Sequence, residues 1–261
     1  MGTPSRGVGR SFLSAGSRSR TRSPTYLEMD SSQYAFVQGM KSTRTTLAAW
    51  NREPGPVLRS WVLGSLGAAT VLLLAVWLVA VITPGAPPSS LRKPPFFVGG
   101  PRDVAHVLFD NSLVLALHAL ACVAGFVAGS QVPLQARAQR GLTRLIHERG
   151  GAIAIGFVVG ATVFSLTNQA YVLGTGLADA AVALHASPGV LLLGLLPHAV
   201  LELTALFLPL AAWIIASRRG EWDKLLAATL VTVVIAVPVL VVTALWEVYL
   251  APRLLQGVIG Y

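Results

Sequence analysis

Two ionisable residues of this 261-residue chain lie inside a long apolar segment, where charge is costly. His198 and Glu202 are four residues apart, which places them on one face of a helix and close enough to interact. A charged side chain costs about 2.5 to 3.5 kcal/mol at the centre of a bilayer, so such residues face the interior of a bundle and find polar partners. The pair could bind a proton or a cation. Alternatively, it could be satisfied by itself and by a neighbouring helix, as a structural lock.

Other polar residues lie in or near apolar segments. Asp110 and Asn111 start the second segment, His118 follows two turns later, and Asn168 and Gln169 lie near the end of the third. We expect the first two near the outer interface, and His118 either packed or facing the interface rather than acting as a ligand. Asn168 and Gln169 are expected to form hydrogen bonds between helices.

The sequence contains none of the motifs H-E-x-x-H, G-x-S-x-G or Walker A. Its single cysteine, Cys122, excludes an intrachain disulfide and a cysteine-based metal cluster. A zinc site on His198 and Glu202 would need a third ligand, which His118 or His185 would have to supply. We therefore predict a protein that is not an enzyme and has no cofactor, with intramembrane metal hydrolysis as an alternative.

The composition indicates that the bilayer, rather than water, surrounds this chain. Hydrophobic residues make up 54% and charged residues 12%, with a mean hydropathy of +0.65. The net charge is +9, but the basic residues gather in a tail and in loops that flank apolar segments. Membrane topology explains this distribution, so we do not expect a nucleic-acid partner.

Five apolar segments are long enough to cross a hydrocarbon core of about 30 Å. They predict an all-α, polytopic membrane helix bundle with about five transmembrane helices, at 60–82, 107–130, 151–173, 188–216 and 225–248. Gly125 with Gly129, and Gly156 with Gly160, have G-x-x-x-G spacing, which lets another helix approach closely. The glycine pairs predict tight packing in the bundle, and they allow a second copy of the chain as a partner.

The fourth segment is too long for one straight span, because a helix over 188–216 would measure roughly 43 Å. Pro197 lacks an N–H and favours the first turn of a new helix, so it predicts the break. We expect a short or re-entrant piece up to Leu196 and a spanning helix from Pro197 to Ala216. His198 would then lie beside unpaired backbone N–H groups, as in the binding sites of many transporters.

Lys and Arg residues predict the orientation. Sixteen lie in 1–59, 131–150 and 217–224, and four in 83–106, 174–187 and 249–261. The positive-inside rule therefore predicts a multi-pass protein of the cell membrane with a cytoplasmic N-terminus and an extracytoplasmic C-terminus, residues 251–261. Residues 1–59 are predicted to be a basic, mostly disordered cytoplasmic tail. The first apolar run starts only at Trp61, so we expect no cleaved signal peptide, and Met29 is a second candidate start of translation.

The segment LPHAVLELTA, residues 196–205, resembles the Pro-His-Gly-x-x-Glu-x-Pro-Ala signature of the stage II sporulation protein M family. Ala199 and Thr204 stand where that signature has Gly and Pro. The matching core is therefore Pro197, His198 and Glu202.

The resemblance extends over about 100–250. Phe109 and Asn111 resemble the family's Phe-x-x-Asn with one residue fewer, and Gly125 and Gly129 match its glycine-bearing span. Residues 168–174 resemble its Asn-Gly-x-x-Leu-Gly, with one residue more and Gln169 in place of Gly. Either Asn168 or Gln169 therefore occupies the Asn position, within a transmembrane domain over 60–250.

The family's name-giving member is a non-enzymatic membrane component that works with peptidoglycan-degrading partners, although many members occur in organisms that form no spores. The resemblance implies an integral membrane scaffold or anchor of an envelope complex. Its partners would be the lipid bilayer and other membrane or envelope proteins, including cell-wall hydrolases at the loop over 84–106. The alternative is a transporter or channel subunit with a proton or cation site at His198 and Glu202.

Overall fold

The computed structural model describes residues 31–86, 99–131 and 142–259, which form helices and short connections with no strand. The long helices are α1 (Ser31–Arg52), α2 (Pro54–Ile82), α3 (Pro101–Phe126), α5 (Leu142–Ala183), α6 (Pro188–Leu206), α7 (Leu208–Arg219) and α8 (Leu225–Leu245). Helix α3 continues into a π-helical segment, η3 (Val127–Gln131), and α8 continues into another, η5 (Trp246–Leu250). A 3₁₀ turn, η4 (Trp222–Lys224), precedes α8. Helix α9 (Ala251–Ile259) ends the described chain.

The predicted all-α membrane bundle is confirmed. Within the described ranges, five helical stretches are long and apolar enough to cross a membrane, at Pro54–Ile82, Pro101–Gly129, Ile155–Ala183, Pro188–Leu206 and Trp222–Gly257. The third extends about ten residues beyond its predicted end at 173, because small and apolar residues continue the helix. Most of the predicted outer segment 174–187 is therefore helical, and Asp179 in it accepts a hydrogen bond from the Ala86 backbone N–H at 2.7 Å.

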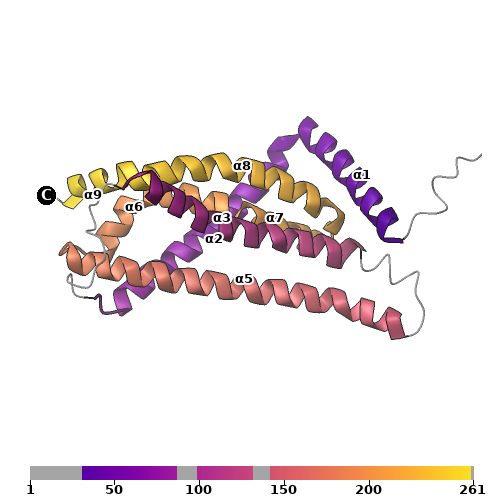
Figure 1. Ribbon diagram of the computed structural model, residues 1–261, viewed down its shortest axis with the longest axis horizontal. Coiled ribbons are helices and arrows are strands. Elements are labelled where there is room, and N and C mark those ends of the chain that lie inside the picture. Colours follow the sequence, from indigo (N-terminus) through magenta and orange to yellow (C-terminus); the bar gives the residue numbers. More distant parts are fainter. Residues whose placement is uncertain (1–30, 87–98, 132–141, 260–261) are drawn as a thin grey trace, which may run out of the picture.

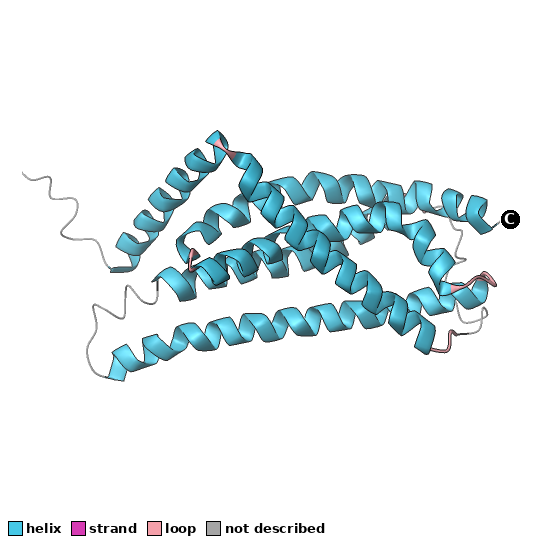
Figure 2. Ribbon diagram, turned by 180° about the vertical axis from the view of Figure 1, so that it is seen from behind, coloured by secondary structure: helices cyan, strands magenta, loops and turns pink. Residues whose placement is uncertain are grey.

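The spans run along the long axis of the molecule, and α2 crosses them obliquely (Figure 1). Helix α2 contacts α5, α6 and α7, whereas α3 packs against α7 and α8. Figure 2 shows the same crossing from behind. Small residues let the helices approach closely, since Ala69, Ala236 and Ala244 have no exposed surface. The bundle places α1 at one end and α9 at the other (Figure 1).

The predicted disordered tail is wrong for residues 31–59, which form α1 and the start of α2. The absence of an apolar run excludes a membrane span, but it does not exclude a polar helix that packs on the bundle through a few residues. Trp50 of α1 meets Trp61 of α2 edge to face, with ring centroids 5.1 Å apart, and α1 also contacts α8. The C-terminal segment likewise forms α9, up to Ile259, and residues 1–30 lie outside the described part.

The predicted break at Pro197 is also wrong. Pro197 lies inside the continuous helix α6, and the chain breaks ten residues later, at Phe207 between α6 and α7. Pro209 explains the position, because it offers no N–H to the Ala205 carbonyl four residues before it and its ring crowds that turn. His198 is therefore in the middle of a helix, and the predicted first-turn N–H groups are not beside it.

The two glycine pairs have different surroundings. A Cβ at Gly125 would lie 2.6 Å from Trp213 Nε1, and one at Gly129 would overlap the Trp222 ring, so both glycines permit close packing. A Cβ added at Gly156 or Gly160 would meet no atom of another helix of the described chain within 4 Å. The predicted close packing at this pair does not come from another helix of the described chain, because the spacing alone does not say which side of α5 faces the bundle.

Candidate functional site

A polar seam joins α3 to the broken helix α6–α7. Three side chains of α3 form it: Asn111 Nδ2 donates to Glu202 Oε1 at 2.8 Å, His118 Nδ1 donates to the Leu206 carbonyl at 3.2 Å, and the Cys122 thiol donates to the Pro209 carbonyl at 3.1 Å. We call these three hydrogen bonds the polar seam. Asn111, His118 and Cys122 are seven and four residues apart, a spacing that keeps them on one face of α3.

The His118 bond of the seam satisfies a backbone carbonyl at the break, and the Cys122 bond joins α3 to the first turn of α7. At Phe207 the helix leaves backbone carbonyls without their usual donors, and an unpaired buried acceptor costs about 1 to 3 kcal/mol. His118 is fully buried and also meets the Phe207 ring edge to face at 5.3 Å. The histidine is thus packed, the first of the two roles expected from its sequence context, and it supports the backbone break rather than the His198 and Glu202 pair.

The upper bond of the seam holds Glu202 at the wall of a cavity of about 340 Å³. Apolar residues of α2, α5 and α6 form most of the lining, including Leu73, Leu177 and Leu192. Three ionisable side chains open on this cavity: His198, Glu202 and Glu247. The first two come from one face of α6, as predicted, and the third comes from η5.

Glu247 was not predicted as a site residue, although the sequence contained the signal. It is the acid near the end of the predicted fifth span, and an ionisable residue within a span is a functional candidate. In the structure it lies in a π-helical segment, a rare form that often accompanies functional sites. Glu247 lines the same cavity as Glu202.

The two carboxyl groups have no basic partner in the described parts of the chain. The ion pair found there joins Lys224 to Glu221 and lies elsewhere. His198 is buried, and its Nδ1 has no hydrogen-bond partner among the described residues. The cavity is therefore lined by polar groups, the His198 imidazole and the two carboxyl groups, that do not form ion pairs with other described residues.

The other predicted site residues lie outside the cavity. Pro197 is exposed on the surface of α6, Asn168 is exposed on α5, and Gln169 donates to Ser165 Oγ within α5 at 3.0 Å. Asp110 and His185 are exposed, at positions that suit the outer interface and a loop.

Comparison with family models, with curated proteins and with solved structures finds no match for this chain. The resemblance to the sporulation family therefore stays a prediction.

The geometry of the cavity suits a proton or a monovalent cation better than a tightly coordinated divalent metal ion. No group of three or more His, Cys, Asp or Glu side chains in the described ranges is arranged to hold a metal. Two carboxyl groups facing one cavity of low polarity repel each other when both are ionised, so a shared proton or a bound cation relieves the repulsion. His198 offers a third group that can exchange a proton.

Proposed function

We propose that this chain is a multi-pass membrane protein that binds a proton or a small cation in the cavity of His198, Glu202 and Glu247, as a transporter or channel subunit. One observation carries the proposal: two carboxyl groups from different spans line one cavity and have no basic partner in the described residues. A structural lock would pair its polar groups with each other. Within the described ranges Glu202 has such a partner, Asn111, whereas His198 Nδ1 has none.

Flux through reconstituted vesicles tests this function. Purified protein in liposomes should move protons or potassium ions down an imposed gradient, followed with a pH-sensitive dye or an ion electrode. Glu202→Gln should lower the flux at least tenfold while preserving the fold, because the glutamine carbonyl still accepts from Asn111. Glu221→Gln, which removes an acid outside the cavity, is the matched control and should leave the flux unchanged. Wild-type flux no greater than that of empty liposomes would refute the proposal.

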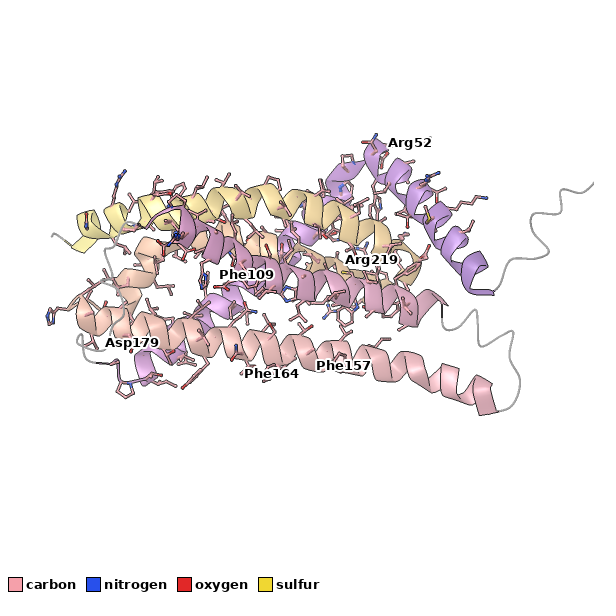
Figure 3. The ribbon with its side chains drawn as sticks, viewed as in Figure 1. Arg52, Phe109, Phe157, Phe164, Asp179 and Arg219 are labelled. Atoms are coloured by element: carbon pink, nitrogen blue, oxygen red, sulfur yellow. The ribbon has the colours of Figure 1, made fainter. Side chains whose placement is uncertain are left out.

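A second candidate, the envelope scaffold, is favoured by the outer face of α5. Phe157 and Phe164 are 77% and 73% exposed there (Figure 3), and Gly156 and Gly160 leave room for another helix. G-x-x-x-G faces are common at contacts between membrane helices, so this face fits an envelope protein or a second copy. Crosslinked membranes should then yield peptidoglycan hydrolases with the wild-type chain. Gly160→Leu should abolish their recovery and Gly67→Leu, at an open position on α2, should not.

The proposed orientation has the α1 end of the bundle in the cytoplasm. Figure 3 shows Arg52 and Arg219 at that end and Asp179 at the opposite end. Arg59, Arg218 and Lys224 belong to the same end by their places in α2, α7 and η4. This clustering supports a cytoplasmic α1 and an extracytoplasmic C-terminus under the positive-inside rule.

A further inference from the structure

Two adjoining cavities lie at the α1 end of the bundle, remote from the site of the proposed function. The larger, about 360 Å³, lies between α1, α2 and α8 and has mainly apolar walls, including Leu47, Leu58 and Val231. The smaller, about 110 Å³, lies between α2, α7 and η4. Trp50, Val57 and Trp61 line both, so one apolar wall connects the two spaces.

The smaller cavity combines apolar walls with a group of polar side chains that carries a net positive charge. Arg219, Lys224, Glu221 and Ser60 line it. The Lys224 Nζ lies 2.8 Å from Glu221 Oε1, so the single carboxylate is paired with the lysine. Arg219 has no carboxylate partner in the described chain, and its guanidinium can form paired hydrogen bonds to a phosphate.

Both cavities lie at the level where we expect the membrane surface. The edge-to-face pair Trp50 and Trp61 stands between them, and tryptophan is enriched where acyl chains meet headgroups. Exposed arginines, Arg52 and Arg59, lie nearby in sequence at the same end. An apolar groove that opens beside a cationic pocket matches a molecule with a hydrocarbon chain and an anionic head.

We propose that these two cavities bind one anionic phospholipid. Its acyl chain occupies the larger cavity, and its phosphate lies against Arg219. A soluble phosphate would leave the apolar cavity empty, and a zwitterionic lipid would bring its own cation to a pocket that already holds a net positive charge. Basic pockets between spans on the cytoplasmic side are typical sites for anionic headgroups.

Native mass spectrometry of the full chain in neutral detergent tests whether the smaller cavity recognises an anionic headgroup. Phosphatidylglycerol should bind at least fivefold more tightly than phosphatidylcholine with the same acyl chains. Arg219→Gln should weaken phosphatidylglycerol binding about fivefold, the loss expected for one basic contact. Arg218→Gln, an exposed neighbour that lines neither cavity, is the matched control and should change binding less than twofold. Equal binding of the two lipids, or equal effects of the two arginine variants, would overturn the proposal.

Separate variants test whether the acyl chain occupies the larger cavity. Val231→Trp should fill the larger cavity and weaken phosphatidylglycerol binding at least fivefold, whereas Val234→Trp, at a 63% exposed position of the same helix, should not. Leu47→Ser on α1 removes part of the wall without touching the bundle core and should also weaken binding. Unchanged binding in both cavity variants, or glycerol phosphate binding as tightly as the lipid, would contradict an acyl-chain site. Ion flux is a separate measurement, so this result and the fate of the proposed function can be told apart.

Discussion

The hydrogen bond between Asn111 and Glu202 should contribute measurably to the stability of the bundle. It joins α3 to α6 at 2.8 Å, and interhelical hydrogen bonds in membranes average about 0.6 kcal/mol with a maximum near 1.7. A double-mutant cycle with Asn111→Ala, Glu202→Ala and the double variant isolates this pairwise term from the loss of packing. We expect a coupling free energy of roughly 0.6 to 1.7 kcal/mol.

The assay is equilibrium unfolding in mixed micelles with increasing sodium dodecyl sulfate, followed by helical circular dichroism. Asn168, exposed on α5, gives the control cycle: Asn168→Ala and Glu202→Ala should add within about 0.5 kcal/mol. A coupling below about 0.3 kcal/mol for the Asn111 cycle would show that the carboxyl group has other partners. The assignment of Asn111 as the residue that holds Glu202 would then be refuted.

Two further predictions test the packing and the orientation. Gly125→Ala should destabilise the bundle by about 1 to 3 kcal/mol in the same unfolding assay, because the added methyl group meets the α7 indole, whereas Gly67→Ala meets open space and should be neutral or stabilising by up to about 1 kcal/mol. In whole cells, Ser187→Cys should react with a membrane-impermeant maleimide, and Ser42→Cys should not. The native Cys122 is buried and should not react in either variant. The reverse labelling pattern would show that the topology is inverted.

Hydropathy sufficed to predict the five spans, because each must satisfy its backbone internally and present apolar side chains to lipid. Hydropathy could not predict the position of the break between α6 and α7. A proline at membrane depth is tolerated when neighbouring groups satisfy the freed carbonyls. One such group, His118, belongs to another helix, so choosing between Pro197 and Pro209 requires the packing of α3 on α6–α7.

The helix α1 and the glycine pair of α5 are two other features that the sequence alone could not predict. A polar helix that docks through Trp50 lacks the apolar run on which the span prediction depends. Gly156 and Gly160 have the spacing of a contact, but the side of α5 that meets the bundle is set by α2 and α6. Glu247, by contrast, could have been found by applying the rule for ionisable residues to the fifth span as strictly as to the fourth.

The same packing decides which polar groups pair. The i, i+4 spacing of His198 and Glu202 predicts only that they share a face, and they do, on one cavity. The donor that Glu202 meets is Asn111, because α3 runs parallel to α6–α7 and its polar face follows that helix from Glu202 to the Pro209 carbonyl. Since Asn111 satisfies one oxygen of Glu202, His198 keeps an unpaired nitrogen at the cavity. This division of partners lets α3 hold the broken helix in place while leaving the imidazole and the two carboxyl groups available to a ligand.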